Sequence, residues 1–364
     1  MSFRTLPARY YTDPEVFREE IESFYFGSWI CAGREAAIPN AGDYFLREIA
    51  GESLIVVRDG AGGVRAHYNV CRHRGTRMCT SQEGNLERIQ CPYHGWTYGL
   101  DGRLLGAPHM DGADFSREDY PLHSVETALW DGHLFLHLGR DAESLSRQLG
   151  DLPEKFAPWR MQELRLFRRI EYEVKANWKL LVLNYNECLH CPFVHPVLNR
   201  LTDYAGADNE PPAPTYIGGA MGFRGGAQTM TADGKRRRDH LPGLSEEERR
   251  KVLYYAIYPN LLLSLHPDYM MVHTLWPQAV DRTKIVCEWH FHPTELAKPG
   301  FFADDAIEFW DATNREDWRI SELAQAGIQS RVYSPGPYSA REGLLHAFDD
   351  VVLQHDLRRT RNHG

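Results

Sequence analysis

The sequence lacks the features of a membrane or secreted protein. Within its 364 residues, no apolar stretch reaches the roughly 18 residues that a membrane-spanning helix needs. The start of the chain, Met1 to Arg4, has no apolar core of the kind found in signal peptides. Of the seven cysteines, two belong to the motifs described below, and the other five (Cys31, Cys79, Cys188, Cys191 and Cys287) are scattered and do not indicate a disulfide framework. We therefore expect a cytoplasmic protein without a membrane partner.

The chain also lacks an excess of positive charge. Its 41 Lys and Arg residues against 50 Asp and Glu residues give a net charge of −9, which argues against nucleic acid as a partner. A redox protein partner is compatible with this charge. A hydrophobic content of 43% and a charged content of 25% are typical of soluble globular proteins, and the length suits two domains.

Two short motifs each combine a cysteine with a histidine: Cys71-Arg-His73 and Cys91-Pro-Tyr-His94. Two thiolates and two imidazoles are the ligands of a [2Fe–2S] cluster in which histidines replace cysteines on one iron. A structural zinc site is the alternative, but such sites usually pair cysteine with cysteine and histidine with histidine along the chain. Because each motif here mixes the two, the sequence predicts an electron-transferring cluster on these four residues.

A second candidate metal site follows later in the chain, at Glu187, His190 and His195. The spacing predicts that Glu187 and His190 share one helix face, and that the helix kinks or ends at Pro192, before His195. Two histidines and one carboxylate can bind a mononuclear non-haem iron on one side and leave the opposite side open for dioxygen and substrate.

The carboxylate ligand of such an iron has to come from another segment. The best candidate is Asp317, within a long helix predicted from about Asp304 to Ala326. On chemistry alone, Glu316 and Asp311 compete with it.

Hydrophobic periodicity divides the chain into three expected regions. Residues 1–40 are a helical segment with an amphipathic helix over Thr12–Trp29, whose first residue and Glu15 form a capping box. Residues 41–150 are an all-β domain that holds the Cys/His motifs, because short alternating strands there are separated by glycine turns. Residues 151–364 are the second domain.

The second domain reads as an antiparallel sheet around a long helix. Its predicted strands lie near Leu166–Ala176, Leu261–Leu265, Tyr269–Leu275 and Thr283–His290. Ser245–Glu248 looks like the capping box of a further helix. The stretch Leu201–Leu244 is poor in periodicity and rich in Gly, Pro and Asp, so we interpret it as a mobile lid or a disordered insertion.

The order Cys-x-His, Cys-x2-His, Glu-x2-His-x4-His and a distal Asp resembles the oxygenase α-subunits of the Rieske non-haem iron oxygenases. The resemblance covers nearly the whole chain. It implies an α+β protein in which an all-β Rieske [2Fe–2S] domain precedes a helix-grip (START-like) catalytic domain with an antiparallel sheet. It also implies that His190, His195 and Asp317 bind Fe(II). In the homotrimer of this family, a bridging carboxylate, here Glu187, is expected to link His94 of one subunit to His190 of its neighbour.

The resemblance further implies the partners of the reaction. Activation of O₂ for monooxygenation consumes two external electrons, and one ferrous ion with one reduced cluster holds both. Because the chain contains no reductase, a separate flavin and iron–sulfur reductase is implied, with NAD(P)H as its cofactor.

The substrate class is suggested by details of the second motif. Ring-dihydroxylating relatives mostly carry aspartate where this chain has Glu187. Together with Asn186–Pro192 and the tail Ser334–Ser339, this residue looks like the branch that acts on quaternary ammonium compounds such as glycine betaine, choline, carnitine or stachydrine. Hydroxylation of an N-methyl group there leads to N-demethylation. The alternatives are ring hydroxylation or O-demethylation of an aromatic acid, or a Rieske electron-transfer protein without a catalytic site.

A cationic substrate favours the faces of aromatic rings. The aromatic residues available in the second domain include Tyr185, Phe193, Tyr216, Phe223, Tyr258, Tyr269, Trp276 and Trp289. Aromatic residues at strand spacing more often belong to the core, so none is assigned to a substrate cage. The basic run Lys235–Arg238 is interpreted as part of a solvated lid, with contact to a substrate carboxylate or to the reductase as the alternative.

Overall fold

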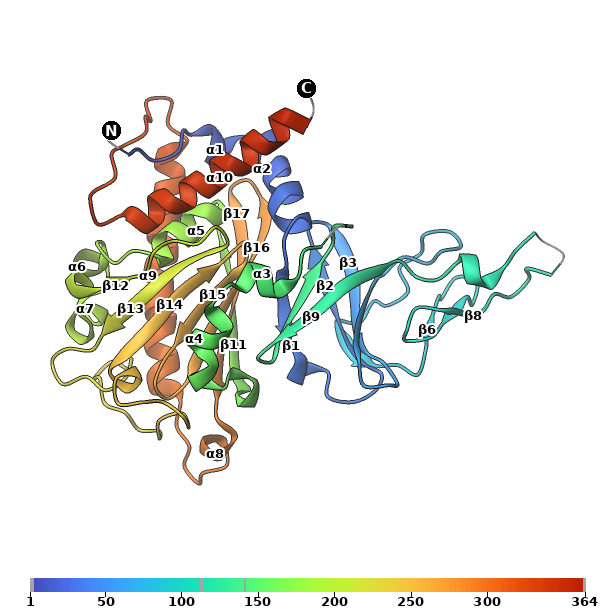
Figure 1. Cartoon of the computed structure of the whole chain (residues 1–364), viewed down its shortest axis with the longest axis horizontal. Helices are drawn as coiled ribbons and strands as arrows, with labels where there is room; N and C mark the ends of the chain where they lie inside the picture. Colours follow the sequence, from blue (N-terminus) through green and yellow to red (C-terminus); the bar gives the residue numbers. More distant parts are fainter. Residues whose placement is uncertain (1–2, 112–113, 141, 363–364) are drawn as a thin grey trace. The chain divides into compact units, whose positions relative to one another are not determined.

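The computed structural model describes residues 3–111, 114–140 and 142–362, with side chains up to residue 356 (Figure 1). Met1 and Ser2, which begin the segment without a signal core, lie outside the described residues. The chain divides into a unit of residues 25–145 and a second unit that joins residues 1–24 to residues 146–364. No helix in the described part of the chain is both long and apolar enough to cross a membrane.

The unit of residues 25–145 is built from antiparallel strands. Among its described residues, seven strands form one sheet in the order β1-β10-β9-β4-β3-β2-β5, and three short strands form a second in the order β6-β7-β8. The strands are β1 (Ile30–Arg34), β2 (Asp43–Ile49), β3 (Glu52–Arg58), β4 (Val64–Tyr68), β5 (Glu83–Asn85), β6 (Ile89–Gln90), β7 (Thr97–Tyr98), β8 (Leu104–Gly106), β9 (Ser124–Trp130) and β10 (His133–His137). This agrees with the expected all-β domain.

The second unit contains one curled antiparallel sheet with the strand order β11-β17-β16-β15-β14-β13-β12. The strands are β11 (Arg165–Val174), β12 (Asp208–Asn209), β13 (Tyr216–Gly222), β14 (Lys251–Ile257), β15 (Leu261–Leu265), β16 (Met270–Ala279) and β17 (Arg282–Phe291). Strand β15 is apolar at four of its five positions and buried at all five, because both of its faces are covered. The antiparallel sheet expected for the catalytic domain is therefore confirmed.

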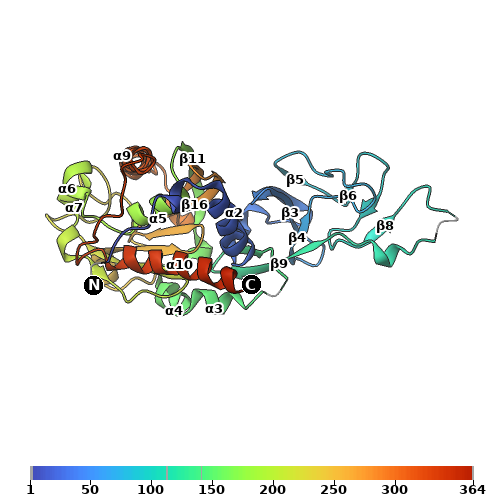
Figure 2. The ribbon, with the colours of Figure 1, turned by 90° about the horizontal axis from the view of Figure 1, so that it is seen from above.

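Helices pack on both faces of this sheet. Figures 1 and 2 show α9 along one face and the short helices α3 and α4 on the other. The helices are α1 (Arg9–Thr12), α2 (Pro14–Glu20), α3 (Leu145–Leu149), α4 (Leu152–Phe156), α5 (Trp178–Tyr185), α6 (Cys191–Val194), α7 (Leu198–Leu201), α8 (Pro293–Leu296), α9 (Asp304–Ile328) and α10 (Gly343–Asn362), with a π-helical turn at Ile21–Phe26. Short 3₁₀ turns lie at Glu35–Ala37, Arg117–Asp119, Ala157–Trp159, Met161–Glu163, Tyr204–Gly206 and Glu248–Arg250. On α9, buried Trp310, Asn314 and Trp318 recur at helical spacing and form the inward stripe.

The N-terminal helix begins at a different cap from the expected one. The Asp13 side chain accepts a hydrogen bond from the Glu15 N–H at 2.8 Å and caps α2, whereas Thr12 ends the preceding turn. The reason is Pro14, because a residue before proline is disfavoured in the helical region, and Asp13 is accordingly extended.

The region from residue 201 to residue 257 also differs from expectation. Instead of a disordered insertion, it supplies β12 and β13 to the sheet. The capping box at Ser245 and Glu248 forms, with Ser245 N–H donating to Glu248 Oε2 at 2.6 Å. Only a 3₁₀ turn follows, because β14 begins at Lys251 and pairs with both β13 and β15. Sheet pairing therefore overrides the local helix signal.

A buried ion pair joins the N-terminal helix to α5. Lys179 Nζ on α5 lies 2.5 Å from Glu20 Oε2 on α2, and both side chains are almost fully buried. Trp178 Nε1 donates to the same carboxylate oxygen at 3.2 Å. The pair fixes the start of the chain against the helix that leads into the second candidate metal site.

We expect Glu20→Ala to lower the free energy of unfolding of the second unit by about 3–5 kcal/mol, because it leaves the Lys179 ammonium buried without its partner. Urea denaturation of the full chain measures this change. Glu22→Ala is the matched control, since Glu22 is exposed on the next turn, and its effect should stay within about 0.5 kcal/mol. Equal effects of the two substitutions would show that the buried pair does not stabilise the unit.

Candidate metal centres

The two Cys/His motifs form matching turns in the unit of residues 25–145. The N–H of Gly75 donates to the carbonyl of Cys71 at 2.9 Å, and the N–H of Gly95 donates to the carbonyl of Cys91 at 3.1 Å. Both glycines lie four residues after the cysteine and have positive φ values of 76° and 71°. A side chain is disfavoured in this conformation, so each motif needs its glycine for the tight turn.

The four side chains of these turns are brought together. The Cys71 and Cys91 thiols are buried, and the rings of His73 and His94 are 4.7 Å apart. The Nδ1 atom of His73 is buried without a hydrogen-bond partner among the described residues. A buried, unsatisfied ring nitrogen beside a second imidazole and two thiols is the donor set that a Rieske cluster requires. These residues therefore fit a [2Fe–2S] cluster.

Two further residues support this cluster site: Trp96, close to the second Cys/His motif, and Tyr98, which the sequence did not single out. The Trp96 ring stacks on His73 at 4.9 Å with an interplanar angle of 5°. The Tyr98 hydroxyl lies 3.6 Å from Cys71 Sγ and accepts a hydrogen bond from the Arg72 N–H at 3.1 Å. Hydrogen bonds to cluster sulfurs tune the reduction potential, so Tyr98 is positioned to act on it. Its only signal in the sequence is its nearness to the second motif.

The second candidate site follows α5, but not on one continuous helix as the spacing predicted. Helix α5 ends at Tyr185, and residues 186–190 form an irregular turn before α6. Pro192 occupies the first turn of α6 and so begins a helix instead of ending one. The irregular turn still brings Glu187 against His190: Nδ1 of His190 donates to Glu187 Oε1 at 2.5 Å.

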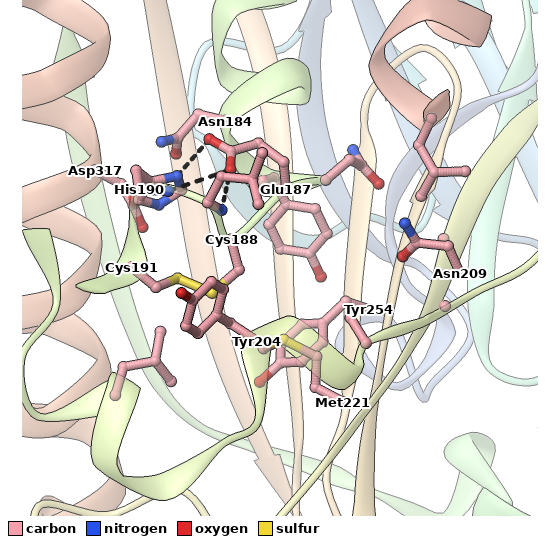
Figure 3. Close-up of a pocket in the computed structure, with 18 of the residues that line it drawn as sticks. Asn184, Glu187, Cys188, His190, Cys191, Tyr204, Asn209, Met221, Tyr254 and Asp317 are labelled. Atoms are coloured by element: carbon pink, nitrogen blue, oxygen red, sulfur yellow. Dashed lines mark hydrogen bonds and ion pairs between the residues drawn. A yellow bond between two sulfur atoms is a disulfide. The ribbon is translucent and has the colours of Figure 1, made fainter. Parts of the chain in front are cut away.

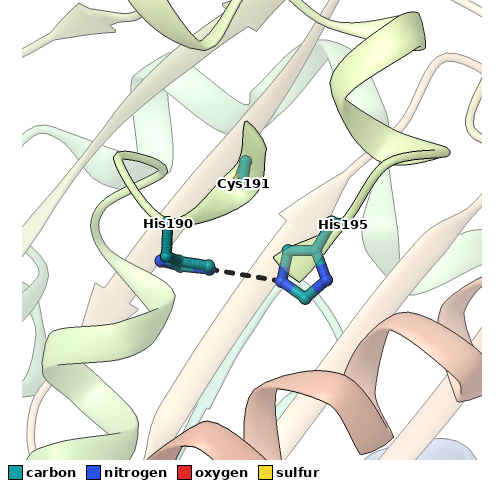
Figure 4. A group of neighbouring side chains, drawn as sticks. All are labelled: His190, Cys191 and His195. Carbon is teal, nitrogen blue, oxygen red and sulfur yellow. Dashed lines mark hydrogen bonds between the residues drawn. The ribbon is translucent and has the colours of Figure 1, made fainter. Parts of the chain in front are cut away.

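Two imidazoles and a carboxylate converge at one point. The Nε2 atoms of His190 and His195 are 3.2 Å apart (Figure 4), and Asp317 Oδ1 lies 3.2 Å from the first and 2.8 Å from the second. Ligands at about 2.1 Å on neighbouring corners of an octahedron are about 3.0 Å apart, so the three atoms fit one face around a single ion. Asp317 is on α9, whereas both histidines belong to the segment after α5.

The electrostatics of this group match a cation site. Burial lowers the pKa of the His190 imidazole, but hydrogen bonds to Asp317 and Glu187 outweigh burial and raise it to about 9. Burial raises the pKa of Asp317, but the two imidazoles together bring it below its usual value. The three groups therefore favour positive charge at their centre.

The three carboxylates that compete in the sequence occupy different places. Glu316 Oε2 accepts a hydrogen bond from Nδ1 of His195 at 2.7 Å, on the side of the ring away from Asp317. Asp311 instead accepts from the Tyr172 hydroxyl at 2.7 Å and pairs with Arg315.

Each of the two histidines thus has a carboxylate on Nδ1, which leaves Nε2 free to bind a metal. Glu187 has this role for His190, and Glu316 has it for His195. In the sequence, Glu316 was considered only as an alternative to Asp317 as the carboxylate ligand of the iron.

Cys191 is another potential donor near the two histidines. Its sulfur lies within 4.8 Å of their ring nitrogens. It is bonded to the sulfur of Cys188, however, and a disulfide sulfur is not a thiolate ligand. Asp317 is therefore the third ligand that the geometry favours.

The candidate iron ligands line a cavity of about 450 Å³ (Figure 3), within the range of roughly 300–1,000 Å³ typical of small-molecule sites. Its wall includes Tyr204 and Asn209 from the segment that the sequence suggested as a lid. His273, on β16, also lines the cavity, and burial lowers its pKa to about 4. It is therefore a neutral imidazole at physiological pH.

The basic run Lys235–Arg238 does not line this cavity, and its solvated-lid interpretation is wrong for Arg238. The Arg238 guanidinium is buried between Asp268, at 3.0 Å, and Asp305, at 2.6 Å. It is part of the core of the second unit.

Two protein-family models match the chain. The Rieske [2Fe–2S] domain matches residues 28–125, and the catalytic domain of the ring-hydroxylating alpha subunit matches residues 161–355. The first match contains the Cys/His motifs, and the second contains Glu187, the two histidines and Asp317.

Similar proteins are known both by sequence and by structure. The carnitine monooxygenase oxygenase subunit of Escherichia coli (strain K12) is 38% identical, over 96% of this chain and 93% of the relative. The glycine betaine monooxygenase oxygenase subunit of Pseudomonas aeruginosa (strain UCBPP-PA14) is 30% identical, over 92% of this chain and 85% of the relative. A crystal structure of the quaternary ammonium Rieske monooxygenase CntA with an inhibitor has a TM-score of 0.83 at 25% identity, over 97% of this chain and 96% of that one. With its Rieske domain and its catalytic domain, this chain belongs to the family of Rieske-type ring-hydroxylating oxygenase α-subunits.

Proposed function

We propose that this protein is the oxygenase component of a monooxygenase that hydroxylates a small quaternary ammonium compound at a carbon next to nitrogen. When bound, Fe(II) on His190, His195 and Asp317 supplies O₂ activation, and a [2Fe–2S] cluster on the Cys/His motifs supplies one of the two electrons. The reaction inserts one oxygen atom into a C–H bond and reduces the other to water with two electrons and two protons. Hydroxylation of an N-methyl group gives a carbinolamine, which releases formaldehyde.

The observation that carries the substrate class is a group of aromatic rings in the same cavity as the candidate iron ligands. Tyr254 is 6.1 Å from Tyr185 and 6.3 Å from Trp310, both nearly edge to face, and all three line the cavity. Trp310 is held in place because its Nε1 donates to the Tyr269 hydroxyl at 2.7 Å. Aromatic faces attract a quaternary ammonium group, which cannot donate hydrogen bonds.

Most of these rings were not among the aromatic residues that the sequence singled out. Of those eight, only Tyr185 lines the cavity, and Phe193 is 89% exposed. The relatives named for carnitine and glycine betaine favour the same substrate class over an aromatic acid. A Rieske electron-transfer protein without a catalytic site would not need a second group of metal ligands, so the candidate iron site argues against this alternative.

Electron supply is the second part of the proposal. A separate flavin and iron–sulfur reductase passes electrons from NAD(P)H to the cluster. In a homotrimer, the cluster of one subunit then serves the iron site of its neighbour through Glu187, as the family resemblance implies. The Glu187 carboxylate is suited to this role because it already holds the His190 imidazole and its side chain is still 17% exposed.

Substrate turnover tests the proposed function. With a reductase and NADH, we expect the purified trimer to consume O₂ in proportion to added glycine betaine, carnitine or stachydrine. N-demethylation should release formaldehyde in equal amount, whereas C–N cleavage should release the amine. Benzoate and methoxybenzoate are the controls. Turnover of these aromatic acids, without turnover of any quaternary ammonium compound, would contradict the proposal.

A further inference from the structure

The acidic side chains that line the cavity all have partners in the protein. Glu187 is bound to His190, Asp317 is bound to two imidazoles, and Glu210 pairs with Lys155. None of these carboxylates therefore needs a ligand group to balance its charge. An ammonium group in the cavity has to rely on aromatic faces and on the negative potential of already paired groups.

Arg341 is the exception among the charged residues of the cavity. It is the one Lys or Arg among the lining residues that the structure describes, and it lies in the turn just before α10. Its backbone N–H donates to the Ser339 hydroxyl at 3.3 Å, but its guanidinium has no hydrogen-bond or ion-pair partner among the described residues. Arg341 is exposed and also lines the cavity, so we place its side chain at the cavity mouth.

We infer that Arg341 binds a carboxylate of the substrate, so that the enzyme selects betaines, which carry both an ammonium and a carboxylate group, over amino alcohols. This inference rests on the proposed function. The aromatic rings that line the cavity with the candidate iron ligands receive the ammonium end, and Arg341 at the mouth receives the carboxylate end. The reacting carbon is then held near the iron ligands by contacts at both ends of the substrate.

The chemistry of arginine explains why the two substrate classes would differ. A guanidinium forms charge-assisted and often bidentate hydrogen bonds to a carboxylate, whereas a neutral hydroxyl gains little from it. The first turn of α10 also lines the cavity, at Gly343 and Leu344, and the positive end of its helix dipole adds to the attraction for an anion. Since the mouth is exposed, water screens the pair and limits its effect.

Binding of two matched ligands tests this inference without turnover. Glycine betaine and choline both carry a trimethylammonium group and differ mainly in carboxylate against hydroxymethyl. Each is titrated calorimetrically into the anaerobic holoenzyme without reductase. We expect Arg341→Ala to weaken glycine betaine binding roughly 10-fold and to change choline binding less than about 2-fold. Arg341→Lys should lie between wild type and Arg341→Ala, and Arg331→Ala, an exposed arginine outside the cavity, should match wild type.

The outcomes separate this inference from the proposed function. If Arg341→Ala binds glycine betaine as tightly as wild type, or if wild type prefers choline, the assignment of Arg341 is overturned while the proposed function stands. If the wild type binds neither ammonium compound but binds benzoate in a way that depends on Arg341, the arginine recognises carboxylates and the proposed substrate class is wrong.

Discussion

Replacing Asp317 by alanine is expected to empty the mononuclear iron site and to lower oxygenation by more than about 100-fold, the upper range for losing a group that only supports a ligand. Asp317 Oδ1 is the anionic member of the three converging atoms, at 3.2 Å and 2.8 Å from the two imidazole nitrogens. Without it, two neutral imidazoles remain, which bind Fe(II) weakly. Iron analysis should fall from three to two atoms per chain, while the visible absorbance of the cluster and its bleaching by dithionite stay unchanged.

The neighbouring acids provide the controls for this prediction. Asp311→Asn, on the same helix, should keep iron and activity, because Asp311 contacts Tyr172 and Arg315. Glu316→Gln should have an intermediate effect, roughly 10–100-fold, because Glu316 only orients His195. Full iron occupancy in Asp317→Ala, together with iron loss in Asp311→Asn, would show that the third ligand is misassigned.

Replacing Glu187 by glutamine is expected to slow electron delivery to the iron roughly 10–100-fold while both metal centres stay filled. Glutamine has nearly the same shape, but it lacks the charge that accepts the Nδ1–H of His190 at 2.5 Å and that would accept a second imidazole N–H from the neighbouring subunit. Reoxidation of the reduced cluster in a single turnover with substrate and O₂ measures this rate. Glu22→Gln, at an exposed position, is the matched control.

Mixed trimers test the same step between subunits of the proposed homotrimer. A Cys91→Ala variant should lack the cluster, and a His190→Ala variant should lack the mononuclear iron, so each variant alone should be inactive. After dissociation and reassembly together, activity should return, because an intact cluster then faces an intact iron site across a mixed interface. No activity in verified mixed trimers, or an unchanged single-turnover rate in Glu187→Gln, would exclude the bridging role.

The sequence by itself determined the features of this protein that depend on short stretches of chain. The Cys/His motifs place four candidate ligands and the turn glycines within a few residues, so the motifs alone predicted the cluster domain, and the Rieske domain match over residues 28–125 agrees. Leu261–Leu265 is apolar at nearly every position, and the strand predicted there has the bounds of β15, which is buried throughout. The resemblance of the motifs to the Rieske oxygenase α-subunits implied the family and the order of the two domains, and both are confirmed.

Several predictions from local sequence were wrong because contacts with distant parts of the chain outweighed the local structural preferences. The capping box at Ser245 forms as predicted, yet β14 follows it, since pairing with two neighbouring strands outweighs helix propensity. The expected helix through Glu187 and His190 is an irregular turn, and both residues line the cavity from it.

Only the tertiary structure decided how distant residues combine. The family resemblance implied Asp317 as the third ligand, but the residues by themselves left Asp311 and Glu316 open, because the choice depends on the rotation of α9 against the segment after α5 and one step along a helix turns a side chain by about 100°. Tyr254, Trp310 and Arg341 enter the cavity from three separate elements. These contacts between distant residues cannot be predicted from spacing along the chain, because they depend on how the sheet curls and how the helices pack on it. Short motifs therefore indicated the chemistry of each candidate metal centre, whereas long-range packing determines the cavity beside the candidate iron ligands and brings Asp317 to the two histidines.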